Sequence, residues 1–441
     1  MNSRRDFLKK TSLGVAGGAM LSMPASSYAR IIGANDRVNT ATIGINSRGN
    51  AHIWAIGKQG KAMNLVALCD VDNRTFEKTL NRFSDLNQKK VKTYTDFRKL
   101  LENDDIDAVT IATPDHWHAP MAIMAMNAGK HVYVEKPCSH NPQEGEWLIQ
   151  TQAKTGMTLQ VGNQQRSAPT SIQLKQEIDG GIIGRPYYAK TWYSNNRGPI
   201  GQAQNAAIPE WLNWELWQGP APRKEFKDIY VHYNWHWFWH WGTGEINNNA
   251  MHELDIARWM LGVSLPDKVN SSGGRFAYDD DWEFYDSQLA TYSFGDDKMI
   301  SWEGLSCRTH PAHYGRGRGT VIYGTEGSAL VDRDGYEIFN KDGEVIKSGS
   351  EKEQSASTDL MGMGGLDTLH IKNFLDGIRE DKKLNSPAKE GHISTLLCHL
   401  GNIAQECGGI IETNNITGKP YSKKAMGFWE REYEEGWKPK V

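Results

Sequence analysis

The stretch T-A-T-I-G-I-N-S-R-G, from Thr40 to Gly49, decides the fold of this chain. Its apolar half reads as a short strand, Gly44 makes a tight turn, and Gly49 lets the next helix pack closely, as in loops that cradle a dinucleotide pyrophosphate. Asn46 replaces the middle glycine of that pattern, and its side chain crowds the approach. The residues expected to form this phosphate loop are Gly44, Asn46, Ser47, Arg48 and Gly49.

An acid follows at the end of the next predicted strand, Leu65–Asp70. In dinucleotide-binding units a carboxylate about twenty residues beyond the loop meets the adenosine ribose hydroxyls. Because an acid repels a 2′-phosphate, Asp70 favours NAD over NADP as the cofactor. Taken singly, the loop also fits an ordinary strand-to-helix turn, and Asp70 a helix cap.

Short apolar runs and helical patterns alternate through the first third of the chain. The predicted strands are Thr40–Ile45, Leu65–Asp70, Lys92–Thr95, Ala108–Thr113, His131–Lys136 and Thr158–Asn163. The predicted helices are Phe97–Glu102, Pro120–Ala128 and Gln143–Lys154, with Gly129 and Gly156 placed to end the last two. The alternation predicts an α/β fold that begins with a doubly wound parallel sheet, a Rossmann domain over residues 36–160.

Longer and more aromatic strand patterns follow, joined by turn sequences such as D-R-D-G and K-D-G. The predicted strands are Arg185–Tyr193, Ser287–Phe294, Lys298–Leu305, Thr320–Gly324 and Ser328–Val331. Helices are expected at His252–Leu261 and His392–Gln405, the latter packing back on the first domain. Residues 161–441 are therefore predicted to form an α+β domain with a large open, mainly antiparallel sheet, for substrate binding and oligomerisation.

Two further stretches end on predicted strands, the edge at which open α/β sheets bind ligands. They are A-T-P-D-H-W-H-A-P (Ala112–Pro120) and H-V-Y-V-E-K-P (His131–Pro137). With these motifs the chain resembles the glucose–fructose oxidoreductase / inositol dehydrogenase / MocA (Gfo/Idh/MocA) family. The resemblance implies NAD(P) binding, a cis peptide before Pro137, and a catalytic Lys136 that contacts nicotinamide ribose and substrate. It also implies cofactor contacts at Thr113, Pro114, His118 and Glu135.

A fourth stretch, Trp241–Asp255, carries the remaining catalytic pattern of that family. The family usually shows an aspartate four residues before a histidine and another aspartate three residues after it. His252 and Asp255 fit, whereas Asn248 takes the place of the first aspartate. The resemblance implies that His252 takes the hydroxyl proton while hydride leaves the same carbon, with Lys136 polarising the oxygen. Losing the acid removes a charge that would raise the histidine pKa, so inositol-dehydrogenase-like base catalysis is in question.

The chain holds sixteen tryptophans, and seven of them are gathered in two short stretches, Trp211–Trp217 and Trp235–Trp241. Aromatic faces stack on the apolar faces of pyranose rings, so such clusters suit a carbohydrate cleft, although most of these side chains are expected in the core. Arg166, in G-N-Q-Q-R, matches a family position near cofactor or substrate, and it also fits a surface ion pair. The predicted substrate contacts are Arg166, Tyr193 and Trp241, and Asn163 is a predicted cofactor contact.

Composition excludes several other classes of function. The net charge of −3 and the absence of a basic stripe speak against nucleic acid, and no apolar run is long enough to span a bilayer. Five scattered cysteines do not form a disulfide framework. His236 and His240 have metal-ligand spacing, but a third ligand is not evident, so no metal is expected. The family resemblance implies a homodimer or homotetramer.

The first 29 residues resemble a twin-arginine export signal. Arg4 and Arg5 precede a short, weakly apolar stretch, and Ser27-Tyr28-Ala29 offers a cleavage site. A basic amphipathic N-terminus or a retained anchor is the other interpretation. Export by this route predicts a periplasmic protein that folds beforehand, with its cofactor already inside.

Together these observations predict an exported NAD(P)-dependent oxidoreductase that acts on a sugar or sugar derivative and regenerates its bound cofactor with a second substrate. The alternative is a glycoside hydrolase, lyase or epimerase that uses bound NAD for transient sugar oxidation with no net redox change. A non-catalytic sensor on the same fold is the least favoured hypothesis, because Lys136 and His252 both remain.

Overall fold

Six parallel strands form the first sheet in the order β3-β2-β1-β4-β5-β6. The computed structural model describes residues 37–441 except 87–89, 309–312 and 352–363, so the predicted export signal lies outside the described residues. The strands are β1 (Val38–Ile43), β2 (Met63–Cys69), β3 (Lys92–Tyr94), β4 (Ala108–Ile111), β5 (His131–Val134) and β6 (Leu159–Val161). This order places the change of direction between β1 and β4, where doubly wound sheets bind dinucleotides.

Helices connect the strands of this sheet, as its parallel direction requires. They are α3 (Gly49–Lys58), α4 (Arg74–Arg82), α5 (Phe97–Leu101), α6 (Asp115–Asn127) and α7 (Pro142–Thr155). Helix α6 starts five residues earlier than predicted, because Asp115 opens it directly after the β4 loop and Pro120 is accommodated inside it. Gly156 adopts a left-handed conformation and ends α7, as its sequence position predicted.

Nine strands form the second sheet, in the order β14-β13-β12-β11-β7-β10-β9-β8-β15. They are β7 (Pro186–Ser194), β8 (Lys268–Gly274), β9 (Ser287–Phe294), β10 (Lys298–Leu305), β11 (Arg318–Gly324), β12 (Gly327–Val331), β13 (Gly335–Asn340), β14 (Val345–Ser350) and β15 (Ile410–Glu412). Only β7 and β10 run parallel among these strands. The predicted fold class, a Rossmann sheet followed by a mainly antiparallel sheet, is confirmed.

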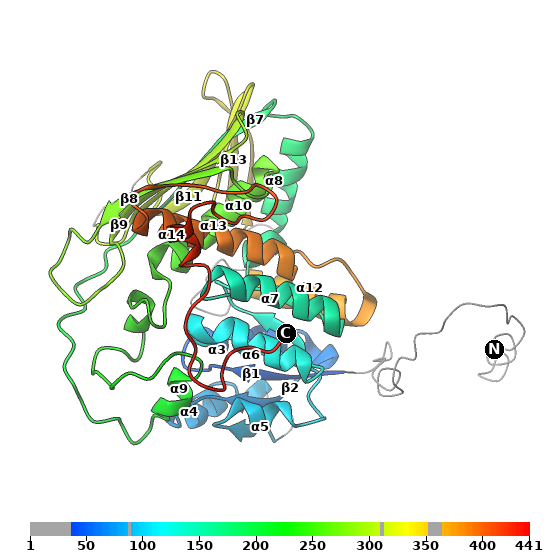
Figure 1. Ribbon diagram of the computed structural model, residues 1–441. Helices are drawn as coiled ribbons and strands as arrows, with labels where there is room; N and C mark the ends of the chain where they lie inside the picture. Colours follow the sequence, from blue (N-terminus) through cyan, green and yellow to red (C-terminus); the bar gives the residue numbers. More distant parts are fainter. Residues whose placement is uncertain (1–36, 87–89, 309–312, 352–363) are drawn as a thin grey trace, which may run out of the picture. The chain divides into compact units, whose positions relative to one another are not determined.

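Helices pack against one face of the second sheet (Figure 1). They are α8 (Pro169–Asp179), α10 (Met251–Leu261) and α13 (Ala388–Glu406). Helix α13 also contacts α7 of the first sheet, and α12 (Gly365–Glu380) contacts α3. Helix α10 continues from a single π-helical turn, Ile246–Ala250, and both segments contact β7 and β10. These contacts bring residues from the second sheet to the carboxyl edge of the first.

Residues 195–245, here called the aromatic segment, connect β7 to the π-helical turn. It contains the short helix α9 (Trp214–Gln218) and a 3₁₀ turn, Asn234–Trp237, but no strand of either sheet. Its own core consists of Leu212, Trp214, Trp217, Ala221, Phe226, Tyr230, Phe238 and Trp241. Most of these aromatic side chains therefore serve packing, because an irregular segment of this length needs a buried core of its own.

Candidate active site

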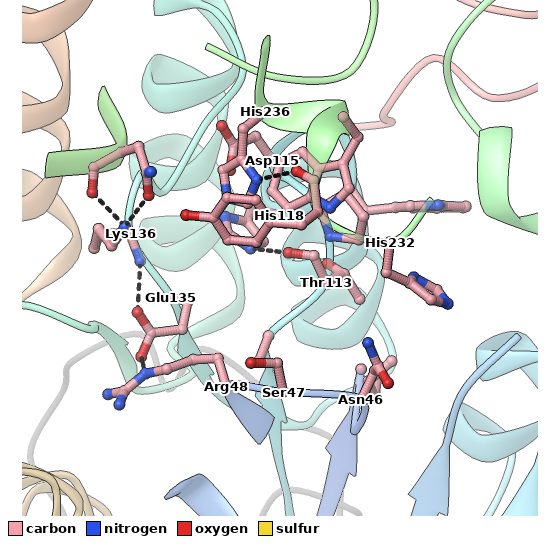
Figure 2. A pocket seen from close by; sticks show the side chains of 18 of the residues that line it. Asn46, Ser47, Arg48, Thr113, Asp115, His118, Glu135, Lys136, His232 and His236 are labelled. Carbon is pink, nitrogen blue, oxygen red and sulfur yellow. Dashed lines mark hydrogen bonds and ion pairs between the residues drawn. The ribbon is translucent and has the colours of Figure 1, made fainter. Parts of the chain in front are cut away.

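A cavity of about 850 Å³ opens at the carboxyl ends of β1, β2, β4 and β5. Figure 2 shows side chains from the first sheet together with His232 and His236 of the aromatic segment around it. Among the predicted site residues, those that line it are Gly44, Asn46, Ser47, Arg48, Asp70, Thr113, Pro114, His118, Glu135, Lys136, Tyr193, Asn248 and His252. The structure thus gathers most of the predicted site from positions more than two hundred residues apart in the chain.

The phosphate loop has a geometry that only glycine allows at two positions. Gly44 has φ +80°, and a Cβ atom there would lie 2.6 Å from the Ala112 carbonyl oxygen. A Cβ atom on Gly49 would lie 2.0 Å from the Gly44 oxygen. The N–H groups of Asn46 and Ser47 make no hydrogen bond within the described residues. The loop therefore presents free donors before the amino end of α3, as a pyrophosphate requires.

Asp70 directly follows β2, lines the cavity, and also holds the loops after β1 and β2 through hydrogen bonds. Its carboxylate accepts hydrogen bonds from the backbone N–H groups of Ile45 (2.8 Å) and Asp72 (2.9 Å). Burial raises the pKa of Asp70, and these two donors oppose the rise. The carboxylate fixes the spacing of the first two strand-end loops and stands where the ribose-binding acid was predicted.

The His118 ring connects the loop after β4 to the loop after β5 through hydrogen bonds. One ring nitrogen lies 2.8 Å from the Thr113 carbonyl oxygen, and the other lies 2.6 Å from that of Pro137. The Lys136–Pro137 peptide is cis, as the family resemblance implied. His118 thus holds the two loops that frame Lys136.

Glu135 is the centre of a buried ionic network beneath the cavity. Its carboxylate accepts hydrogen bonds from Arg48 (2.8 Å) and Gln164 (2.8 Å) and lies 3.0 Å from His52 Nε2. Burial favours the neutral acid, but the Arg48 charge and the His52 contact outweigh it and hold the pKa of Glu135 well below its ordinary value. Arg48 in turn binds Asp367 of α12, which connects the phosphate loop to the second part of the chain.

Lys136, which follows β5, is hydrogen-bonded to Asn248 of the π-helical turn before α10. The Lys136 ammonium donates to the Asn248 backbone oxygen at 2.7 Å and to its side-chain oxygen at 3.3 Å. Burial lowers the pKa of Lys136, whereas the charges of Glu135 and Asp115 act in the opposite sense. The π-helical turn brings the Asn248 carbonyl into reach, because such a turn widens the backbone hydrogen-bonding pattern and frees an oxygen.

His252 faces the cavity with both ring nitrogens free of hydrogen bonds to the described residues. Burial lowers the pKa of His252 well below its ordinary value, and the charges of Arg333 and Lys136 lower it further. The ring is therefore neutral at physiological pH, so it offers an acceptor nitrogen for a proton. A neutral imidazole next to an ammonium group is the pairing needed to deprotonate a polarised hydroxyl.

The aromatic segment is bound to the loop after β2, at the end of the cavity where Asp70 lies. Asn73 donates its N–H to the Trp211 oxygen (3.0 Å), and Asn213 donates to that of Val71 (2.9 Å). His232 Nε2 lies 3.0 Å from the Asp72 carboxylate. The Arg74 guanidinium lies 3.4 Å from the centre of the Trp211 ring. Because His232, Trp217 and Trp235 also line the cavity, this segment forms one wall of it.

The structure does not bring Arg166, Asp255, Trp241 or Asn163 into the cavity lining. Arg166 and Asp255 form a buried ion pair (2.8 Å), and Ser394 donates to the same carboxylate. Trp241 is fully buried between other aromatic rings. Asn163 is buried, and its amide makes no hydrogen bond among the described residues. The ligand contacts proposed for these four residues stay predictions, and the structure places all four outside the cavity lining.

Several cavity residues were missed by sequence reasoning. Asp115 belongs to the quoted A-T-P-D-H motif and accepts a hydrogen bond from Thr243, so its motif was a usable signal. His236 had been considered only as a metal ligand; burial lowers its pKa to about 3, and it stacks on Trp235 at 3.6 Å. Arg197, Arg318 and Arg333 also line the cavity, and nothing in their local sequence distinguishes them.

The described residues contain no group of three or more histidine, cysteine, aspartate or glutamate side chains placed to hold a metal ion. No helix in the described part of the chain has the length and apolar character needed to cross a membrane.

Comparison with protein families places this geometry in context. Residues 38–163 match the model described as oxidoreductase family, NAD-binding Rossmann fold, and residues 171–323 match the C-terminal alpha/beta domain of the same family. The alpha-N-acetylgalactosaminidase of Tannerella forsythia is 33% identical over 93% of this chain and 95% of its own length. A glycosyl hydrolase family 109 protein of Parabacteroides distasonis is 26% identical over 86% of this chain and 89% of its own. A family 109 protein of Shewanella baltica is 27% identical, and its match spans 45% of its own length.

Solved structures share the fold at lower identity. Levoglucosan dehydrogenase in complex with NADH and levoglucosan superposes with a TM-score of 0.67 at 19% identity, covering 86% of this chain and 99% of that one. The WlbA dehydrogenase of Bordetella pertussis in complex with NADH and UDP-GlcNAcA gives a TM-score of 0.64 at 20% identity, with the same coverage.

Proposed function

Since the chain belongs to the Gfo/Idh/MocA family of oxidoreductases, we propose that it is an NAD-dependent glycoside hydrolase, which oxidises its sugar transiently and restores it within one turnover. The observation that carries this proposal is the 33% identity to an alpha-N-acetylgalactosaminidase over nearly the whole of both chains. It favours the redox-neutral alternative over net sugar oxidation, which was the leading hypothesis from the sequence. An alpha-N-acetylgalactosaminide is accordingly the first substrate to test.

The cavity fits NAD by its shape and its donors. The crowded glycines Gly44 and Gly49 keep the loop close to its neighbours, and the free N–H groups of Asn46 and Ser47 would hold the pyrophosphate. Asp70 would meet the adenosine ribose and repel the additional phosphate of NADP. The chemistry that bound NAD supplies is reversible acceptance of a hydride from a sugar carbon, with no net redox change.

Lys136 and His252 supply the proton chemistry on the sugar. The Lys136 ammonium would polarise the oxygen of the hydroxyl that is oxidised, and neutral His252 would take the proton of that hydroxyl. While that carbon is a ketone, the neighbouring C–H bond is acidic. Loss of its proton expels the glycosidic oxygen, which leaves as an alcohol once protonated. Water then adds its hydroxyl group at the vacated carbon, and the deprotonated carbon regains a proton. The sum is hydrolysis, because one water is consumed and the hydride returns to the sugar.

A second proton carrier is needed for this sequence, and the cavity offers two candidates. His236 presents a free Nε2 because its Nδ1 lies 2.6 Å from the Tyr233 oxygen and donates to it. The Tyr193 hydroxyl accepts a hydrogen bond from Asn195 at 2.8 Å, and burial raises its pKa, so it stays protonated and able to donate. The hydrolase cycle needs a second acid–base group, and both residues line the cavity where they could supply it.

Retention of the cofactor is the second requirement of a redox-neutral cycle. The aromatic segment is attached to the loop after β2 by two backbone hydrogen bonds, a contact between His232 and the Asp72 carboxylate, and a cation–π contact. We infer that these contacts keep NAD in place between turnovers. Retention would also suit the periplasm, to which we propose the chain is exported, because no free nicotinamide pool is available there.

The experiment uses protein purified without added nucleotide. With an aryl alpha-N-acetylgalactosaminide, we expect release of the aryl alcohol and no accumulating nicotinamide absorbance. The Lys136→Met variant should lose this activity while keeping its bound NAD, and Glu102→Gln, on an exposed ion pair, is the control. A net absorbance change that tracks substrate consumption, without release of the alcohol, would return the assignment to a dehydrogenase.

A further inference from the structure

We propose that this active site takes glycosides that carry an oxyanion, a carboxylate or a sulfate group, and that Arg333 is the residue that selects them. The inference rests on the proposed hydrolase activity and names the substrate class for it.

Arg333 lies in the turn between β12 and β13 and lines the cavity. It is partly buried, and it makes no hydrogen bond or ion pair with any residue that the structure describes. Its neighbour Asp332 does not neutralise it, because that carboxylate is bound by Arg316 (2.5 Å) and by the N–H groups of Asp334 (2.8 Å) and Gly335 (3.2 Å). Arg333 thus offers a guanidinium group to the cavity with no carboxylate attached.

The other arginines around the cavity are each paired with an acid. Arg318 binds both oxygens of Glu253 (2.7 and 3.0 Å), and Arg197 binds Glu245 (2.7 Å). Arg48 is bound to Glu135 and Asp367. Among the arginines that line the cavity in the described part of the chain, Arg333 is thus the one that contacts no carboxylate.

This charge lies close to the reacting groups. The charge of Arg333 is, after burial, the largest influence that lowers the pKa of His252. Burial and the charge of Arg318 lower the pKa of Arg333 itself. Burial is the larger cause of both shifts, and the contributions of Arg333 and Arg318 add like charge near His252 that a bound anion would offset. A carboxylate or sulfate fits a guanidinium fork through two parallel N–H···O bonds.

The position of Arg333 favours the substrate over the cofactor. It lies in a turn of the second sheet, near Tyr193 and Arg318 of that sheet. Arg48 of the phosphate loop, whose charge also acts on it, is already bound to Glu135 and Asp367. The pyrophosphate donors, by contrast, stand on the loop after β1. The anion that Arg333 meets is therefore a substituent of the sugar or of its leaving group.

Direct binding tests the proposal without turnover. Protein of known NAD content is titrated by tryptophan fluorescence with glucuronate against glucose, and with the 6-sulfate of N-acetylgalactosamine against N-acetylgalactosamine. We expect one acidic sugar to bind about ten times more tightly than its neutral partner or better, and added salt to weaken that preference. The acid that shows it distinguishes carboxylate from sulfate recognition.

Arg333→Gln should reduce the affinity for the acidic sugar about 10- to 100-fold and leave that for the neutral sugar nearly unchanged. Arg333→Lys should recover part of the loss, because it restores the charge without the fork. Arg185→Gln, on an exposed arginine at the start of β7, is the matched control and should change nothing. In glycoside hydrolysis, the Arg333→Gln loss should appear in KM for acidic substrates.

Equal binding of acidic and neutral sugars by the unaltered protein would overturn the proposal, as would a preference for the acidic sugar that survives in Arg333→Gln. Loss of bound NAD from that variant would also overturn it, because it would assign Arg333 to the cofactor. Failure of the hydrolase assignment looks different. The binding preference for an acidic sugar would persist, while neither acidic nor neutral glycosides would be cleaved.

Discussion

At the scale of single residues, the pairing of a neutral His252 with a cationic Lys136 sets the pH behaviour of the site. Burial and two nearby cations favour the uncharged imidazole, whereas an aspartate in the place of Asn248 would favour the charged form. The asparagine therefore adds no negative charge that would favour the protonated form of His252. A histidine base is thus physically compatible with asparagine at position 248, where the family usually shows an aspartate.

The pH profile of kcat/KM should show this directly. Because the pKa of His252 is lowered, the base form persists as pH falls, and the acid limb should lie below the ordinary histidine value of about 6.5. Asn248→Asp adds a negative charge beside His252, so the acid limb should move to higher pH by about one unit. Profiles of both proteins, with NAD content held equal, are the measurement; an acid limb that does not move would remove His252 from the base role.

Glu135 should contribute to the free energy of unfolding through its buried contacts with Arg48 and His52. Glu135→Gln removes the charge that Arg48 and His52 meet in a buried site, and we expect a loss of about 3 kcal/mol in the free energy of unfolding. The lowered pKa of Glu135 means that its contribution is present above the ordinary glutamate pKa and is lost only as pH falls through the folded value.

Urea unfolding of the two proteins at neutral and acidic pH is the check. Glu102→Gln, at an exposed site, should change stability by less than about 0.5 kcal/mol. A Glu135→Gln protein as stable as the control at neutral pH would show that the network is not a stabilising one.

At the scale of elements, the strand-end loops were largely predictable and the aromatic segment was not. Alternating apolar runs predicted all strands of the first sheet to within two residues, because all of them except the mostly exposed β3 are largely buried and short. In the second sheet, β8, β13, β14 and β15 were missed. Strand β14 has no buried residue and β8 ends in glycines, so neither shows the apolar pattern of a buried strand.

The aromatic segment acts through contacts that no local pattern encodes. Its composition predicted a carbohydrate cleft, but its contact with the loop after β2 joins Asp72 to Leu212 and His232, far away in the sequence. Likewise, Arg166 and Asp255 were predicted as site residues from family positions, and the structure pairs them with each other in the core. Sequence spacing does not distinguish a buried ion pair from two ligand contacts.

Weakening this contact should release the cofactor. Asp72 binds both Arg74 and His232 and does not line the cavity, so Asp72→Ala should loosen the aromatic segment without touching NAD. We expect the variant to lose most of its NAD during gel filtration, and added NAD to restore its activity. Retention equal to that of the unaltered protein would mean that the segment does not hold the cofactor.

At the scale of the whole molecule, the predicted export signal and the proposed retention of NAD support each other. The predicted twin-arginine signal would carry the chain across the membrane after folding, with NAD already bound. Replacing Arg4 and Arg5 by lysine should leave active, NAD-containing protein in the cytoplasm, as fractionation and activity assays would show. Efficient export of that double variant would contradict the predicted route.

The most direct test of the central claim is hydrolysis in deuterated water by protein that received no added NAD. Transient oxidation makes the C–H bond of the carbon next to the oxidised carbon exchange its proton with solvent. The released sugar should therefore carry deuterium at this neighbouring carbon, while the nicotinamide absorbance returns to its starting value. Sugar released without deuterium there would contradict the redox-neutral elimination, and oxidised sugar with an intact glycosidic bond would show net dehydrogenation instead.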